Sequence, residues 1–173
     1  MVVAVQDCPA RLVPAGTKIN IPKDTFVTIT QALGGNYTVA VNGNMARVDG
    51  TDAAALGLEA EELVFGENNT NEILEDQVWY ALKSIYDPEI PVNLVDLGLI
   101  YSVNINHETS FIQIVMTLTA PGCGMGPVMV SDIKYRLEKV PNVNKVDVEL
   151  VFDPPWNREM MSEEAQLETG MFY

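Results

Sequence analysis

The first third of the chain alternates apolar and polar residues in short runs, and turn residues separate these runs. The strand-like runs include KINI, TFVTITQAL and YTVAVNG, with turn signals at PAG, PKD, GGN and NGN. Short alternating runs bounded by Gly, Pro and Asn are typical of β-strands joined by tight turns. We therefore expect a small β-rich domain over residues 1–66, which ends where the polar stretch GENNTNE begins.

A different pattern follows this polar stretch. From about Asn71 to Tyr86 the apolar residues recur at helical spacing, behind Asn and Thr residues that could cap a helix. The apolar positions of this predicted helix are Leu74, Val78, Ala81, Leu82 and Ile85. Strict alternation then predicts two strands over residues 99–106 and 112–118, joined as a hairpin through the turn His107–Glu108–Thr109.

The remaining pattern predicts one more helix and one more strand. Helical spacing runs from Met125 to Val140, with basic residues toward its C-terminal end. Alternation returns after Lys145, with Val146, Val148, Leu150 and Phe152 on one face. The order α-β-β-α-β predicts an α+β fold, in which residues 71–160 form a two-layer domain with both helices on one face of a small mixed sheet. Residues 161–173 are expected to form a short C-terminal helix and tail.

Composition limits the classes of partner. The 173 residues include 10 Lys and Arg against 24 Asp and Glu, which gives a formal net charge of −14. This charge repels a phosphate backbone or an anionic membrane surface, so nucleic acid is not expected as a partner. No stretch reaches the ~18 consecutive apolar residues of a membrane span, and the first residues lack a basic leader. We therefore expect a cytoplasmic protein whose two cysteines, Cys8 and Cys123, stay reduced.

Cys123 is the strongest candidate for chemistry, in the stretch TLTAPGCGMGPVM between an expected strand and an expected helix. Unpaired N–H groups at a helix N-terminus lower the pKa of a nearby thiol and favour the thiolate, which binds metal or attacks electrophiles. Gly122 and Gly124 remove side-chain bulk, so that a large ligand could approach. Alternatively, Cys123 is a small buried residue and the glycines only permit a tight turn. The residues alone leave both interpretations open.

Carboxylates gather in the stretch DPEIPVNLVDLGLIY, where Asp87, Glu89 and Asp96 fall in the loop between the first helix and the first strand of this domain. They could bind a hard cation or polarise a ligand of the cysteine. Alternatively, Asp87 ends the helix before a proline and Asp96 begins a turn. The hydroxyl of Thr119 could donate to a thiolate, or Thr119 could simply finish the strand.

Three other residues, Cys8, Trp156 and His107, are of types that often carry chemistry or contacts. Cys8 is a candidate second thiol or a plain strand residue, and Trp156 is a candidate partner contact or an anchor for the C-terminal segment. His107, the single histidine, is predicted at the other end of the strand from Cys123, roughly 40 Å away if about a dozen residues span ~3.4 Å each. This separation argues against a Cys–His catalytic pair, and no metalloprotease, phosphate-loop or dinucleotide motif occurs. We therefore expect no enzymatic activity.

These stretches together resemble the SufT family of iron–sulfur cluster assembly proteins. The likeness from residue 72 to residue 160 rests on DPEIPVNLVDLGLIY, TLTAPGCGMGP and VDVELVFDPPWN, and it extends to the wider PaaD-like group of small metal–sulfur cluster assembly factors. The N-terminal residues resemble the extension of SufT-type members through DCPARLVPAGT, TITQALGGNYTV and DGTDAAALGL. The resemblance implies that Cys123 is the family's hallmark cysteine, supported by Thr119 and the acidic loop.

The resemblance further implies a maturation factor that binds iron or an iron–sulfur cluster transiently through Cys123 and passes it to client apoproteins. A cluster usually needs about four thiolate or equivalent ligands, and the chain has two cysteines. The other ligands are therefore expected from a second subunit of a homodimer, an assembly scaffold, a client or small thiols. Two alternatives stay open: a metal-free adaptor between the assembly machinery and its clients, and a thiol-dependent transferase.

Overall fold

The structure is a computed structural model, and it describes residues 1–13, 16–32, 36–65, 70–86, 92–118 and 126–169. The chain divides into two compact units, Met1–Leu63 and Val64–Tyr173. Each unit has a hydrophobic core of its own, and no residue of one core cluster belongs to the other unit. The predicted boundaries of the domains stay a proposal.

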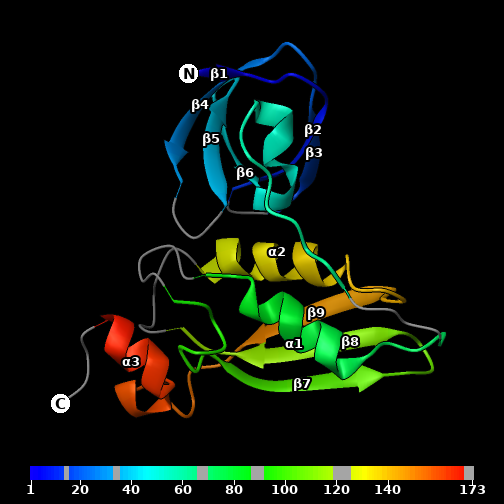
Figure 1. Cartoon of the computed structure of the whole chain (residues 1–173), viewed down its shortest axis with the longest axis vertical. Coiled ribbons are helices and arrows are strands. Elements are labelled where there is room, and N and C mark those ends of the chain that lie inside the picture. The colour runs from blue at the N-terminus through cyan, green and yellow to red at the C-terminus, as the bar shows by residue number, and fades with distance from the viewer. Residues whose placement is uncertain (14–15, 33–35, 66–69, 87–91, 119–125, 170–173) are drawn as a thin grey trace. The chain divides into compact units, whose positions relative to one another are not determined.

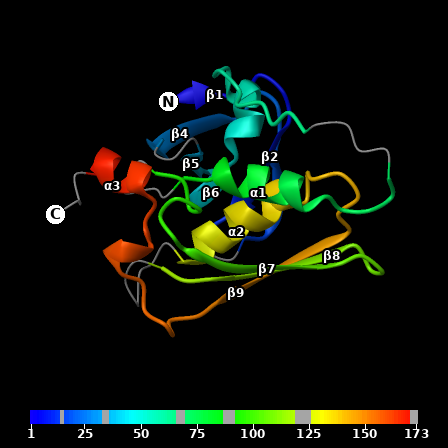
Figure 2. The ribbon, with the colours of Figure 1, turned by 60° about the horizontal axis from the view of Figure 1, so that its bottom comes forward.

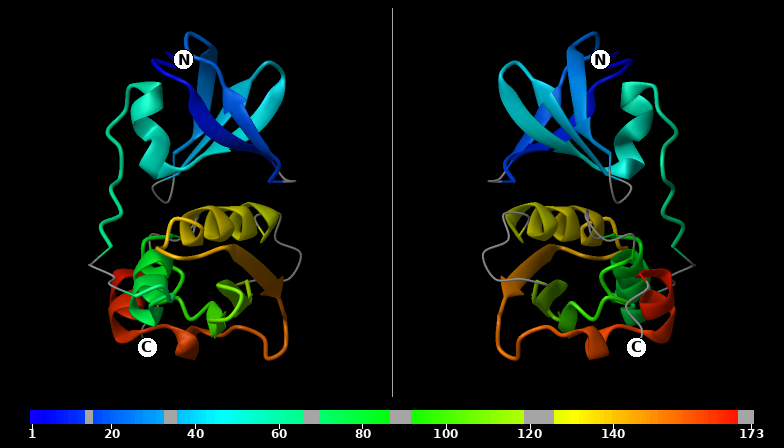
Figure 3. Two further views of the ribbon diagram at one scale, coloured as in Figure 1. Left: turned by 90° about the vertical axis from the view of Figure 1, so that its right-hand side faces the viewer. Right: turned by 90° about the vertical axis from the view of Figure 1, so that its left-hand side faces the viewer.

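The first unit is built from six short strands. They are β1 Val2–Val3, β2 Cys8–Leu12, β3 Lys18–Ile21, β4 Phe26–Gln31, β5 Tyr37–Val41 and β6 Asn44–Val48. The strands pair in the order β1-β4-β5-β6-β2-β3, and every pair is antiparallel. The all-β prediction is confirmed, with one addition: the 3₁₀ helix η2, Gly50–Leu56, packs on one side of the curved sheet (Figure 3).

Several of the polar groups buried in this first unit are held by hydrogen bonds. Arg11 and Arg47 lie directly opposite each other on β2 and β6, and both are 2% exposed. Nη1 of Arg47 donates to Oγ1 of Thr38 at 2.9 Å. The carboxylate of Asp49 accepts from the amide and the hydroxyl of Thr51, which caps the N-terminus of η2. Such bonds offset the cost of burying charged groups.

The second unit has the predicted order of elements. Its bounds are α1 Glu75–Lys83, β7 Ile100–Asn106, β8 Phe111–Met116, α2 Gly126–Leu137, β9 Lys145–Leu150, the 3₁₀ helix η3 Arg158–Met160 and α3 Glu163–Thr169. β8 pairs antiparallel with β7 and parallel with β9, so the three-stranded sheet is mixed. Figures 1 and 2 show α1 and α2 on the same face of this sheet. The predicted two-layer α+β fold is confirmed.

Alternation along β8 explains this layering. Ile112, Ile114 and Met116 are fully buried and belong to the core, whereas Phe111, Gln113 and Val115 point to the other face and are only partly buried. Apolar residues at every second position place their side chains on one face of the sheet. Helices cover that face, and the other face stays closer to solvent. The last strand stops earlier than its pattern predicts, because β9 ends at Leu150 and Phe152 is 43% exposed.

The first helix of this unit is shorter than predicted, Glu75–Lys83 rather than residues 71–86. The expected Thr cap instead closes a local turn, in which Oγ1 of Thr70 accepts from the amide of Glu72 at 3.2 Å. The residue at the N-cap position is Leu74, which has no capping side chain. At the other end, Nη1 of Arg136 donates to the carbonyl oxygen and the hydroxyl of Ser84 at 2.9 and 3.0 Å, and so satisfies groups that the helix end leaves open.

Candidate functional site

The three stretches that carry the family resemblance meet at one end of the strands of the mixed sheet. We call this end, where β7 starts and β8 and β9 finish, the sheet edge. β7 begins at this edge, and β8 and β9 end there, because Ile100 lies opposite Met116 and Met116 lies beside Leu150. Beyond the strands, the amide of Thr117 donates to the carbonyl of Leu99 at 2.9 Å, and the amide of Val151 donates to the carbonyl of Met116 at 2.8 Å. The end of the acidic stretch, the start of TLTAPGCGMGP and the start of FDPPWN are therefore neighbours.

Most of the predicted site residues lie outside the described residues. These are Cys123, Thr119, Gly122 and Gly124, together with Asp87 and Glu89. The described residues that flank the cysteine stretch, Leu118 and Gly126, lie next to each other: a Cβ on Gly126 would come 3.1 Å from Cδ1 of Leu118. It would also come 3.4 Å from Cδ1 of Leu150, so glycine at the first position of α2 lets this helix end lie close against the sheet.

Asp96 is the acidic site residue that the structure describes. Its amide donates to Oδ1 of Asn93 at 2.9 Å, and its carboxylate Oδ2 accepts from Nδ2 of the same Asn93 at 2.6 Å. Asp96 therefore lies within a turn whose first residue is Asn93, rather than at the start of a turn, and its side chain is half-buried. The same carboxylate lines a hollow of about 250 Å³, together with Tyr86, Val92, Asn93, Glu164 and Ala165.

Trp156 belongs to the packing of its own unit. Its indole Nε1–H donates to the carbonyl of Leu97 at 2.6 Å, and the side chain packs, half-buried, against the core. The hydrogen bond spans 59 positions in the sequence, between the loop before β7 and the segment after β9. This geometry favours the interpretation of Trp156 as an anchor of the C-terminal segment over that of a partner contact.

Thr117 is a residue that sequence reasoning missed. It is fully buried at the sheet edge described above, and within the described part of the chain its hydroxyl Oγ1 has no hydrogen-bond partner. A buried hydroxyl without a partner costs about 1–3 kcal/mol. The only signal available in the sequence was its place in the T-L-T repeat, two positions before Thr119. Periodicity assigns such a residue to a strand and says nothing of its partners.

Cys8 lies in the core of the first unit. It is fully buried on β2, its Sγ donates weakly to the carbonyl of Pro9 at 3.6 Å, and it forms no disulfide. Burial, with a smaller contribution from the charge of Asp52, raises the pKa of the Cys8 thiol to about 11. Because the thiolate is the form that binds metal, these properties favour the structural interpretation of Cys8.

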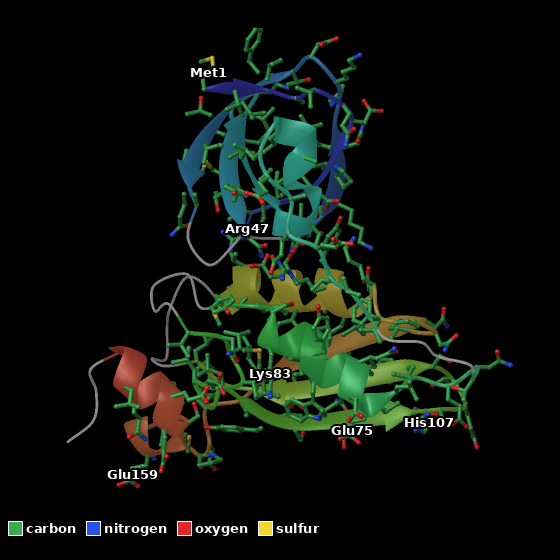
Figure 4. All side chains as sticks on the ribbon, viewed as in Figure 1. Met1, Arg47, Glu75, Lys83, His107 and Glu159 are labelled. Atoms are coloured by element: carbon green, nitrogen blue, oxygen red, sulfur yellow. The ribbon has the colours of Figure 1, made fainter. Side chains whose placement is uncertain are left out.

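His107 lies in the exposed turn between β7 and β8, at the end of the sheet opposite the edge described above (Figure 4). β8 itself has 6 residues, and such a strand spans about 20 Å. The predicted separation of His107 from Cys123 stays a prediction, because Cys123 lies outside the described residues.

The described residues contain neither a cluster of metal ligands nor a membrane-spanning helix. No group of three or more His, Cys, Asp or Glu side chains in that part of the chain is placed to hold a metal ion. Among the helices that the structure describes, none is both long and apolar enough to cross a lipid bilayer.

Comparison with known proteins identifies relatives. Residues 75–150 match the family model described as iron–sulfur cluster assembly protein. An Fe–S protein maturation auxiliary factor of Porphyromonas gingivalis is 46% identical over 102 residues, which are 58% of this chain and 96% of that protein. The Fe–S protein maturation auxiliary factor SufT of Staphylococcus aureus is 38% identical over 87 residues, which are 50% of this chain and 98% of that protein.

Solved structures agree with these matches. A domain of unknown function from Bacillus anthracis is 39% identical, with a TM-score of 0.53, and the alignment covers 57% of this chain and 92% of that one. A conserved hypothetical protein of Thermotoga maritima is 36% identical, with a TM-score of 0.52, and the alignment covers 58% of this chain and 98% of that one.

Proposed function

The chain belongs to the SufT family of iron–sulfur cluster assembly proteins and is an iron–sulfur protein maturation factor, and we propose that it works by holding iron or a whole cluster transiently at Cys123. The iron or cluster is cargo, received from an assembly scaffold and passed to client apoproteins. The proposed compartment is the cytoplasm, where thiols stay reduced.

The observation that carries this proposal is the meeting of three stretches at one edge of the mixed sheet. The hydrogen bond from Thr117 to Leu99 and that from Val151 to Met116 join segments that are far apart in the sequence. A parallel β8–β9 pair next to an antiparallel β7–β8 pair is needed for this, since only then do one strand start and two strand ends share an edge. Loops at such an edge are held by a rigid scaffold, which is where binding residues usually occur.

The count of thiols supports a transient and shared site. Of the two cysteines, Cys8 is fully buried in the first unit and has a raised pKa. Cys123 is thus the single thiol left to bind cargo, against about four ligands for a stable cluster. We propose that a second copy of the chain, a client, a scaffold or small thiols supply the others, with a homodimer as the expected assembly.

The supporting residues have defined parts in this proposal. The hydroxyl of Thr119 donates to the sulfur, and Gly122 and Gly124 leave room for cargo or for another protein's ligand. The carboxylates of Asp87, Glu89 and Asp96 attract the cation, which steers iron toward the site. The named relatives are maturation factors, and we propose that this chain likewise catalyses no reaction of its own.

Anaerobic reconstitution tests the proposal. The full chain, its Cys123→Ser variant and its Cys8→Ala variant are incubated with ferric iron, sulfide and a thiol reductant, and then separated by size exclusion. We expect iron and sulfide, with their visible absorption, in the parent and in Cys8→Ala, and at least a tenfold lower iron content in Cys123→Ser. Cys8→Ala is the matched control because it removes the other thiol of the chain.

The same experiment distinguishes the metal-free adaptor. If Cys123→Ser carried as much iron and sulfide as the parent and transferred it to an apo-ferredoxin equally fast, the cargo would not bind at this thiol. The adaptor interpretation would then stand, with a partner pull-down that does not depend on Cys123.

A further inference from the structure

The C-terminal segment of the second unit crosses the loop that carries Asp96. We call residues 154–165 the C-terminal strap. Its docking is anchored by two core residues, Met161 and Ala165, which are 5% and 1% exposed and belong to the same core cluster as α1 and α2. The strap is therefore a packed part of the unit.

Three contacts join the strap to the three consecutive residues Asp96, Leu97 and Gly98. The amide of Ser162 donates to the carbonyl of Asp96 at 2.8 Å, and Nε1 of Trp156 donates to the carbonyl of Leu97 at 2.6 Å. Gly98 has a φ of +78°, and the space for a Cβ there is taken by the backbone of Met160. Each backbone position of the turn is thus fixed by a different residue of the strap.

A fourth contact continues the strap along the sheet. The register between β7 and β8 shifts between Ile100 and Ser102, which leaves Tyr101 at a bulge. Its hydroxyl donates to the carbonyl of Pro154 at 2.6 Å. Bulges of this kind redirect a side chain, here toward the start of the strap.

Asp96 is consequently held at two points, its carboxylate by the loop and its backbone by the strap. On the loop side, Nδ2 of Asn93 donates to its Oδ2 at 2.6 Å. On the strap side, the strap fixes the carbonyl of Asp96 itself and that of the next residue. A carboxylate so held has few accessible orientations, which lowers the entropic cost of binding a cation.

We propose that Trp156 is a positioning residue, which orients the carboxylate of Asp96 for cargo binding through the hydrogen bond from its indole to Leu97. This inference rests on the proposed function, because it takes Asp96 as a supporting residue of the iron site. Trp156 itself does not touch the cargo. The strap is then the structural support of the acidic loop.

The test compares Trp156→Phe with Trp79→Phe in the full chain. The first substitution keeps an aromatic ring in the packed position and removes the N–H that reaches Leu97. The second removes the chemically identical group from an exposed i,i+4 pair on α1, where Nε1 of Trp79 donates to Oε1 of Glu75 at 3.2 Å. The two variants therefore make the same chemical change inside and outside the strap.

Amide hydrogen exchange gives the first readout. In Trp156→Phe we expect the amides of Asp96 and Ser162 to exchange roughly tenfold faster, the factor that one net hydrogen bond is worth. The amide of Ile114, in the central strand, exchanges as in the parent, since the core is untouched. Trp79→Phe leaves the exchange of the Asp96 and Ser162 amides as in the parent.

Iron loading gives the second readout. Its dependence on both Trp156 and Asp96 distinguishes a positioning role from a purely structural one. Trp156→Phe and Asp96→Asn are expected each to weaken ferrous iron loading about tenfold, and the double variant no more than Asp96→Asn alone, because Trp156 acts through Asp96. Additive losses in the double variant would overturn the inference, and so would unchanged exchange of the Asp96 and Ser162 amides in Trp156→Phe.

The outcomes separate this inference from the proposed function. If Asp96→Asn loads iron like the parent, Asp96 has no part in the site and the positioning role fails, whatever Cys123→Ser does. If Cys123→Ser loads iron like the parent while Asp96→Asn and Trp156→Phe lose it non-additively, the thiol assignment fails and the positioning role stands.

Discussion

The backbone of Met160 occupies the space where Gly98 would carry a side chain. A Cβ on Gly98 would lie 2.7 Å from the carbonyl carbon of Met160, and Gly98 has a φ of +78°. Both facts disfavour any other residue at this position, the first by overlap and the second by backbone strain. The loop at Gly98 and the strap at Met160, more than 60 positions apart in the sequence, can therefore approach this closely because Gly98 has no Cβ.

Gly98→Ala is expected to lower the free energy of unfolding of the second unit by roughly 2–5 kcal/mol, as the sum of left-handed strain and overpacking. Gly43→Ala is the matched control, because Gly43 has a φ of +82° with nothing within 4 Å of its Cβ position. That variant is expected to cost about 1–2 kcal/mol, from strain alone. Scanning calorimetry, which follows both units, measures the two losses. Equal losses would contradict the close approach of Met160.

Thr117→Val is expected to raise the free energy of unfolding by about 1 kcal/mol, because it removes a buried hydroxyl that has no hydrogen-bond partner among the described residues and keeps nearly the same shape. Thr38→Val makes the same change where the hydroxyl accepts from Arg47, and it is expected to lower that energy by roughly 1–3 kcal/mol. Calorimetry of the two variants against the parent gives both signs. A loss of stability in Thr117→Val would mean that its hydroxyl has a partner.

Alkaline pH is expected to weaken the first unit through Cys8. The folded pKa of about 11 lies above the ordinary value of a thiol, so the unfolded chain releases its proton first as the pH rises. The contribution of Cys8 is therefore fully present below about pH 9 and is lost between there and pH 11, by about 3 kcal/mol in all and about 2 kcal/mol by pH 10.5. Calorimetry at pH 8 and pH 10.5 measures this loss. Cys8→Ala is the control, and it should show a smaller decrease over the same interval by that amount.

The two units are expected to fold independently, as their separate cores indicate. A chain of residues 64–173 should unfold cooperatively, with a midpoint within roughly 5 °C of that of the second unit in the full chain, a shift that corresponds to about 1 kcal/mol. Both tryptophans lie in this part of the chain, so their fluorescence follows the transition. A non-cooperative transition in the isolated piece would contradict the division into domains.

Local patterns in the sequence were sufficient for the elements of the fold. The alternation around Ile112 and Ile114 predicted a half-buried strand, and both side chains are fully buried on the helix-covered face. The exact start of α1 was missed, because Thr70 bonds within its own turn rather than capping the helix. Competition between a local turn and a cap involves two nearly equal hydrogen bonds, so the sequence alone does not decide between them.

The arrangement of the site residues, in contrast, could not be predicted from local patterns. Motifs identified Asp96 and Trp156 as notable residues, but nothing in their spacing predicted that one turn and one strap would hold each other. The sequence also left Cys8 open as a second candidate thiol, because a strand pattern does not say which face of the strand lies against a core. Its complete burial is seen only in the structure. Thr117 escaped notice for the same reason.

The sequence by itself determined which residues alternate, where helices and strands form, and to which family the chain belongs, because these properties depend on neighbours within a few positions and on long shared stretches. Only the tertiary structure decided that β9 runs parallel beside β8, that Trp156 bonds to Leu97, and that Met160 covers Gly98. Those contacts join residues tens of positions apart, and they form only where burial of a common core brings the segments together.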